Sequence, residues 1–195
     1  MKINKITVRA ILIYSAYILI LGMLQTNWPA GISIMGTRPD LTLILAVLCG
    51  YMFGQRDGLA VGLAAGFFRD TLAGRTLGLG MLVLMYAGML AAVAFRRFFK
   101  SNVALGIVQV FMATLIYEFL ITGLTFILPM LPDVTYSLEI LTRHFLDRLP
   151  GVLLVNGLAS IPLMLLLYFA GPYRRGTHQD DADESIVGDS LWQVK

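Results

Sequence analysis

Six apolar runs, separated by short polar segments, constrain this chain more than any other feature. They lie at residues 7–26, 41–54, 59–73, 79–95, 103–128 and 152–170. A helix needs about 20 apolar residues to cross about 30 Å of hydrocarbon, and the first, fifth and sixth runs reach that length. Only 14% of the residues are charged, against about a quarter in soluble domains. The pattern predicts an all-α integral membrane protein, a transmembrane bundle of six helices.

The second and third runs are short for a membrane span. Residues 41–54 would form a helix of about 21 Å at the usual rise of about 1.5 Å per residue. Either these two runs are short spans that thin the bilayer, or they form a re-entrant hairpin around Gln55, Arg56 and Asp57. Both alternatives return the chain to the same side of the membrane. We favour two spans, because re-entrant loops are the rarer solution.

The basic residues predict the orientation in the membrane. With the N-terminus inside, ten Lys and Arg residues fall on the inner side: Lys2, Lys5, Arg9, Arg56, Arg96, Arg97, Lys100, Arg174, Arg175 and Lys195. Five fall on the outer side: Arg38, Arg69, Arg75, Arg143 and Arg148. This bias predicts a multi-pass protein of the cell inner (cytoplasmic) membrane with both termini in the cytoplasm.

The same distribution argues against nucleic-acid binding. A nucleic-acid interface needs basic residues on one solvated face, whereas these residues stand at the ends of apolar runs. We therefore expect the lipid bilayer, and no nucleic acid, as a partner.

Two further segments lie outside the apolar runs. Residues 176–195 contain five acidic residues and one Lys, a composition that predicts a short disordered cytoplasmic tail after a six-span domain of residues 1–175. Between the fifth and sixth runs, Leu138, Leu141, Phe145 and Leu149 repeat at intervals of three and four. That spacing predicts an amphipathic helix at the outer interface, which either caps the bundle or docks a partner.

The sequence gives little indication of a catalytic or metal-binding site. Cys49 is the only cysteine, and the two histidines are His144 and His178. The sequence contains no Gly-x-Ser-x-Gly, His-Glu-x-x-His or Walker motif, the patterns that mark common hydrolases and nucleotide-binding enzymes. We predict no enzyme activity, no cofactor and no metal site.

A stripe of small residues runs through the third apolar run. Gly58, Gly62, Gly66, Asp70 and Gly74 follow one another at intervals of four, and Gly78 continues the spacing. Residues four apart on a helix lie nearly above one another, and small residues let two membrane helices approach closely. We therefore predict that the stripe, including the Asp70 carboxylate, faces a neighbouring helix or a partner rather than lipid.

Two alternatives remain for Asp70. Arg69 precedes it and Arg75 follows it, so the carboxylate could form an ion pair or cap a helix end in the tight turn before Gly78. The other alternative is direct contact with a ligand or partner, since ionisable residues inside a membrane are costly and often functional.

A second acidic side chain, Glu118, lies deeper in a predicted span. No other charged residue occurs between Ser101 and Pro132. An isolated carboxyl group at such a depth is either protonated or hydrogen-bonded, here to groups such as Tyr117, Tyr86 or Asn156. A structural hydrogen bond is favoured over proton coupling, because one acid without a partner base makes a poor relay.

Two segments resemble a known family. Residues 38–41 read Arg-Pro-Asp-Leu before a short apolar run, and residues 66–78 contain Gly-x-x-x-Asp-x-x-x-Gly-x-x-x-Gly before a long one. Both are similar to the pattern of the rod shape-determining protein MreD family, most densely over residues 38–99. Asn156 and Pro162 in the last run agree more loosely. At Arg69 the family more often has an apolar residue.

The resemblance implies a fold and a function. The fold would be a six-helix bundle similar to the substrate-binding subunits of energy-coupling-factor transporters. The function would be that of a non-catalytic scaffold of the cell-elongation machinery for peptidoglycan synthesis. Its partners would be an MreC-like membrane protein and, indirectly, MreB, RodA and a penicillin-binding transpeptidase.

The fold similarity also supplies an alternative function, that of a vitamin-binding transporter subunit. Such a subunit needs a polar cavity lined by aromatic residues and open to the outside. The predicted outer loops offer few hydrogen-bonding groups beyond Asn27, Trp28 and Tyr136, so we favour the scaffold.

Overall fold

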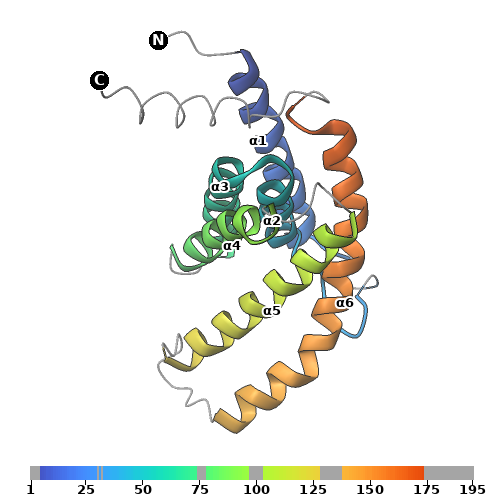
Figure 1. The fold of residues 1–195 in the computed structure, drawn as a ribbon. Coiled ribbons are helices and arrows are strands. Elements are labelled where there is room, and N and C mark those ends of the chain that lie inside the picture. Colours follow the sequence, from blue (N-terminus) through green and yellow to red (C-terminus); the bar gives the residue numbers. More distant parts are fainter. Residues whose placement is uncertain are drawn as a thin grey trace, which may run out of the picture.

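A computed structural model describes residues 5–29, 31, 33–73, 78–96, 103–127 and 138–173. These residues form six helices, α1 (Lys5–Thr26), α2 (Leu41–Phe53), α3 (Gln55–Ala73), α4 (Leu79–Arg96), α5 (Val103–Ile127) and α6 (Leu138–Ala170), shown in Figure 1. The predicted all-helical class is confirmed. Gly74, Arg75, the connection between α5 and α6, and the acidic tail lie outside the described residues, so the predicted division at residue 175 stays a prediction.

The helix at the centre of the molecule is α2, which contacts each of the other five helices. Every residue from Leu41 to Tyr51 is buried, which suits a helix that is apolar on all sides. With 13 residues it is about 20 Å long. Protein therefore surrounds α2 over most of its length, and lipid does not reach it.

The connection from α2 to α3 consists of Gly54 alone, at φ 115°. A side chain is disfavoured at this backbone conformation, which glycine adopts freely. The next turns bring three glycines of different helices together. A Cβ atom on Gly58 would overlap the carbonyl oxygen of Gly88 in α4 and lie 2.6 Å from the Cα atom of Gly50 in α2. Helices α2, α3 and α4 thus form one closely packed unit.

Three of the described helices are long and apolar enough to cross a membrane: α1, α5 and α6. Large apolar side chains are exposed on all three, and Phe169 of α6 is 72% exposed, which fits a surface that contacts lipid. Helices α2 and α4 are apolar but shorter. Six full spans, or a re-entrant hairpin of α2 and α3, therefore stay predictions. The start of α1 and the end of α6 lie at the same end of the molecule (Figure 1).

The segment predicted as an amphipathic helix before the last span is helical, but it is continuous with that span. Residues 138–170 form one helix, α6, with Pro150 and Pro162 inside it, and it changes direction about half-way along (Figure 1). Proline removes one backbone hydrogen bond and bends a helix without necessarily ending it. Leu141, Phe145 and Leu149 are half-buried on the predicted face, whereas Leu138 is exposed.

Candidate functional site

A carboxylate that bonds to several helices, that of Asp40, stands immediately before α2. Its Oδ1 atom accepts hydrogen bonds from the backbone N of Leu43 at 3.0 Å and from the Thr42 hydroxyl at 2.8 Å. An aspartate at this position satisfies backbone N–H groups that have no partner within the first turn of a helix. Asp40 is therefore the N-cap of the central helix.

Two further helices bond to the same carboxylate. The Arg69 guanidinium of α3 donates to Oδ2 at 2.8 Å, and Gln25 Nε2 of α1 donates to Oδ1 at 3.3 Å. Gln25 Oε1 also accepts from the Thr42 backbone N at 3.1 Å. The guanidinium carbon of Arg69 lies 5.1 Å from the centre of the Tyr117 ring in α5, within the range of a cation–π interaction. The first three helices are thus tied together beside α5.

The backbone of Asp40 extends the network to the last helix. Asn156 of α6 is fully buried; its Oδ1 accepts from the Asp40 N at 2.8 Å, and its Nδ2 donates to Thr114 Oγ1 of α5 at 3.1 Å. We name this network the Asp40 node: Gln25, Asp40, Thr42, Arg69, Thr114 and Asn156. It joins five of the six helices through the polar groups of six residues.

The remaining helix, α4, is held by Asp70. This side chain is 5% exposed, and its Oδ2 accepts from the backbone N of Gly78 at 3.0 Å and of Met81 at 3.1 Å. Gly78 has φ 123°, a conformation that favours glycine. Asp70 therefore links the end of α3 to the start of α4 as a cap.

Of the structural alternatives for Asp70, the structure shows the cap, and Arg69 forms its salt bridge with Asp40 instead. Neighbouring residues on a helix point about 100° apart, so Asp70 faces α4 while Arg69 turns toward Asp40. The other expected partner, Arg75, lies outside the described residues. The order of charged residues along the sequence suggested an ion pair within α3. The salt bridge that Arg69 forms, with Asp40, joins residues 29 positions apart.

The glycine stripe of α3 lies against α4. A Cβ atom on Gly58 would overlap the carbonyl oxygen of Gly88, one on Gly62 would overlap that of Leu84, and one on Gly66 would overlap the backbone of Met81. The three glycines therefore bring the two backbones into contact, and Asp70 bonds the next turn of the same face. Gly78 has open space around its Cα and serves the turn instead; Gly74 lies outside the described residues.

The second predicted intramembrane acid, Glu118, is half-buried on α5. One partner proposed from the sequence, Asn156, bonds to Asp40 and Thr114 instead. Glu118 thus lies one turn of α5 after Thr114 of the node.

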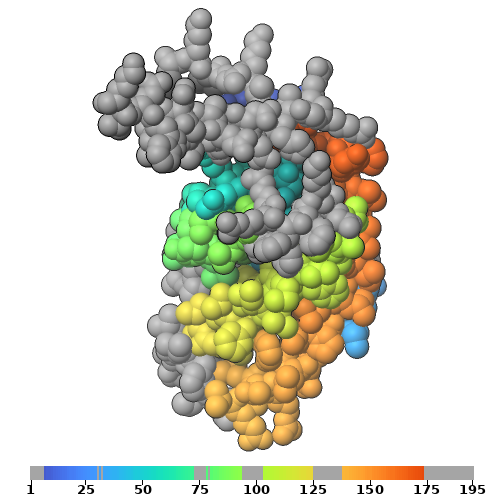
Figure 2. Space-filling view, in the orientation of Figure 1, coloured from blue at the N-terminus to red at the C-terminus, as the bar shows by residue number. Residues whose placement is uncertain are grey.

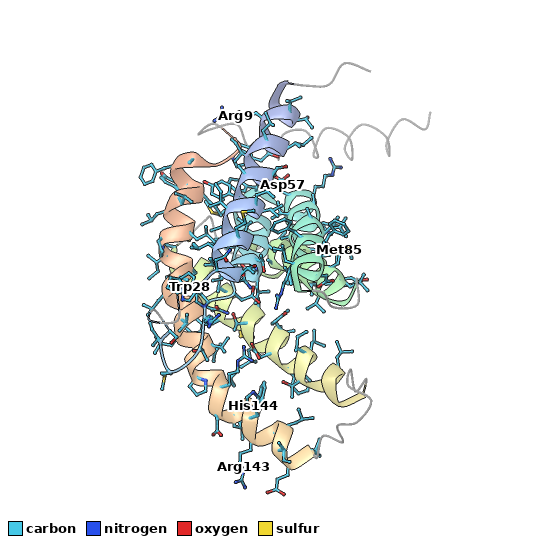
Figure 3. All side chains as sticks on the ribbon, turned by 180° about the vertical axis from the view of Figure 1, so that it is seen from behind. Arg9, Trp28, Asp57, Met85, Arg143 and His144 are labelled. Atoms are coloured by element: carbon cyan, nitrogen blue, oxygen red, sulfur yellow. The ribbon has the colours of Figure 1, made fainter. Side chains whose placement is uncertain are left out.

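Two polar cavities open beside the node, and both are lined by Arg38. One, of about 480 Å³, includes His144, Asp147 and Arg148; the other, of about 460 Å³, includes Gln25 and Arg69. His144 lies on the lower half of α6 as seen from behind in Figure 3. Within the described ranges, no group of three or more His, Cys, Asp or Glu side chains could hold a metal ion.

The opposite end of the molecule has a smaller polar contact. The Tyr173 hydroxyl, just after α6, donates to Asp57 Oδ1 of α3 at 3.1 Å, and Figure 3 shows Asp57 beside the middle of α1. The Phe53 ring lies between those of Tyr14 and Tyr173, with centroids 6.3 and 5.6 Å away. This contact fixes the end of α6 to α1–α3.

From the sequence, Asp40 was identified only as part of a family pattern. Its role as the residue that joins several helices was not predicted. A signal was present, since Pro39-Asp40 directly before an apolar run is typical of a helix start. No comparable signal links Asp40 to Arg69 or Asn156, because these residues lie 29 and 116 positions away.

Comparison with known proteins adds one match. The family model described as rod shape-determining protein MreD matches residues 4–169. Neither the curated proteins nor the solved structures gave a match, so the expected likeness to the vitamin-transporter subunits stays a prediction.

Proposed function

This chain belongs to the family of the rod shape-determining protein MreD, and we propose that it is a non-catalytic membrane scaffold of the cell-elongation machinery for peptidoglycan synthesis. Membership implies a role in rod-shape determination. The finer proposal, a scaffold rather than an enzyme, depends on what the polar groups of the chain do.

The Asp40 node is the observation that carries this proposal. Catalysis needs an acid, base or nucleophile with a free position for the reacting atom. The Asp40 carboxylate instead takes hydrogen bonds from Gln25, Thr42, Leu43 and Arg69. The buried amide of Asn156 uses both its oxygen and its nitrogen. These groups hold helices in a fixed arrangement, which is what a binding platform requires.

The proposed setting is the inner membrane, with six spans and both termini in the cytoplasm. One observation supports an even number of crossings, and a second supports the orientation. The start of α1 and the end of α6 lie at the same end of the molecule (Figure 1), and basic residues are twice as frequent on the proposed inner side. We propose an MreC-like membrane protein as the direct partner, with MreB, RodA and a penicillin-binding transpeptidase as indirect ones.

The alternative, a vitamin-binding transporter subunit, gains no support from the cavities beside the node. Such a subunit would stack its ligand on aromatic rings, yet no Phe, Tyr or Trp is among the described residues that line either cavity. Among the described residues, both are lined by arginine and other polar side chains, together with Met35 in one and Leu72 in the other.

Depletion of this protein from its own bacterium tests the proposal. We expect cells to round up and to lose incorporation of a fluorescent D-amino acid along the side wall, and both effects should be reversed by the wild-type gene. Tagged protein purified from native membranes should carry an MreC-like protein. Unchanged cell shape after depletion, or a growth defect cured by added vitamins, would contradict the scaffold.

A further inference from the structure

One of the two polar cavities beside the Asp40 node lies between α6 and the loop that joins α1 to α2. Its volume is about 480 Å³, and Figure 2 shows the loop, in blue, against α6, in orange. The described residues that line it come from both elements: Met35, Gly36, Thr37 and Arg38 from the loop, and His144, Asp147 and Arg148 from α6. We name it the Arg38 cavity.

Two arginines give the Arg38 cavity its positive charge. Arg38 and Arg148 are both exposed, and neither forms a salt bridge with another described residue. Asp147, the acidic side chain among the described residues of the lining, offsets one of these charges at most. In the neighbouring cavity, by contrast, the charge of Arg69 is balanced by Asp40. The Arg38 cavity therefore offers free guanidinium groups, which bind phosphate oxygens well.

The loop also places an exposed apolar side chain beside these charges. Met35 is 72% exposed and has φ 53°, a conformation that is uncommon for residues other than glycine. Gly36 follows with φ 70°, and the Thr37 backbone N donates to the carbonyl oxygen of Ile34 at 3.0 Å. Tight turns with two successive positive φ values usually have Asn, Asp or Gly first. Methionine at this position is disfavoured by its backbone and by its contact with water, and contact with lipid would remove the second cost.

The loop follows a helix whose length matches the bilayer. Helix α1 is long and apolar enough to cross a membrane, and its 22 residues extend over about 33 Å, close to the hydrocarbon thickness of about 30 Å. When α1 crosses the membrane, the loop at its end lies near the boundary between acyl chains and headgroups. Met35 can then contact acyl chains while Arg38 contacts phosphate.

We propose that the Arg38 cavity binds the phosphate group of an anionic phospholipid in the outer leaflet. Arg38 and Arg148 bond to the phosphate oxygens, and Met35 lies among the acyl chains. His144 can donate one more hydrogen bond in either protonation state. A soluble phosphate ester has the same anionic group but no acyl chain for Met35. The inference rests on the proposed membrane setting and goes beyond the scaffold function by adding a lipid ligand.

The test uses the full chain in detergent, titrated with phosphatidylglycerol, with bound lipid counted by native mass spectrometry. Phosphatidylcholine with the same acyl chains is the lipid without net charge. Glycerophosphoglycerol, the headgroup without acyl chains, represents a soluble phosphate ester and is added as a competitor. We expect phosphatidylglycerol to bind about fivefold to twenty-fivefold more tightly than phosphatidylcholine, since each arginine near anionic lipid contributes about fivefold. The headgroup alone should compete only weakly.

Variants separate this cavity from the other basic residues of the chain. Arg38→Gln and Arg148→Gln should each weaken binding of phosphatidylglycerol about fivefold. Arg143→Gln, on the same helix but outside the described lining of the cavity, should leave binding unchanged. Asp147→Asn removes a negative charge from the lining and should strengthen binding, an effect that poor folding does not produce. Met35→Ser should weaken binding of the lipid but not of the headgroup.

Equal losses in Arg143→Gln and Arg148→Gln would mean that lipid responds to the net charge of the chain, and would overturn the proposal. Equal binding of phosphatidylglycerol and phosphatidylcholine would also overturn it. So would competition by the headgroup as strong as that of the lipid, which would indicate a site for a soluble phosphate ester. The titration involves no partner protein and no cell growth, so its failure and a failure of the cell-shape experiment are separate results.

Discussion

Replacing Asp40 by Ala should destabilise this protein by about 3 kcal/mol of unfolding free energy. The substitution removes the N-cap of the central helix and the counter-ion of Arg69 in one step. It leaves the guanidinium in a site where only 24% of the Arg69 side chain is exposed. The loss therefore has two parts, which can be estimated separately.

The cap is worth about 1 kcal/mol of unfolding free energy. A hydrogen bond to a charged group contributes about 1.5–3 kcal/mol. The Arg69–Asp40 pair keeps side-chain exposures of 24% and 14%, so solvent screening argues for the middle of that range at most. Together these give a loss of about 3 kcal/mol for Asp40→Ala. Asp40→Asn keeps an oxygen for the cap and should lose about 2 kcal/mol.

Thermal unfolding in detergent measures these losses. A loss of about 3 kcal/mol corresponds to a fall in Tm on the order of 10 °C for a chain of this size. The matched control is Glu139→Gln, which breaks the pair of Glu139 with Arg143 on α6, where side-chain exposures are 79% and 75%. Arg143 points away from the rest of the molecule (Figure 3). That change should cost about 0.5 kcal/mol or less.

A double-mutant cycle measures how much the Arg69–Asp40 ion pair contributes to the free energy of unfolding. Asp40→Asn with Arg69→Leu should lose about 1–2 kcal/mol less than the sum of the two single changes, because removing both partners leaves no unpaired charge. Additive losses would refute the reasoning and show that Arg69 acts mainly through its contact with Tyr117.

Three further predictions concern other parts of the fold. Gly62→Leu should prevent accumulation of the protein, because the side chain would enter the α4 backbone, whereas Gly123→Leu, at a site with open space, should accumulate normally on an immunoblot. Asp70→Asn should melt within a few degrees of wild type while Asp70→Leu loses about 1–2 kcal/mol of cap stability; equal melting of both would contradict the cap. In a background without the native cysteine, a cysteine at His144 should react with a membrane-impermeant maleimide in intact cells and one at Gln55 should not. Labelling at Gln55 would exclude the proposed orientation.

The sequence by itself determined the class of fold and several local features. Apolar runs specify helices, because a chain in lipid has to satisfy its backbone hydrogen bonds within each segment. The interval of four between Gly58, Gly62 and Gly66 specifies that they share a face, since helix periodicity is a local property. The Pro39-Asp40 pair marks the start of a helix for the same local reason.

Only the tertiary structure decided which groups meet. Periodicity predicts which residues share a face of a helix. It does not predict which other helix packs against that face, or which polar groups of the two helices lie at the same depth in the membrane. Arg69 therefore looked like a partner of Asp70 but pairs with Asp40, and Asn156 bonds to the start of α2 rather than to Glu118. The continuity of α6 through Pro150 also depends on tertiary structure. Packing of α6 against α5 outweighs the tendency of Pro150 to end a helix. Long-range pairing depends on how helices cross, and no short stretch of sequence contains that information.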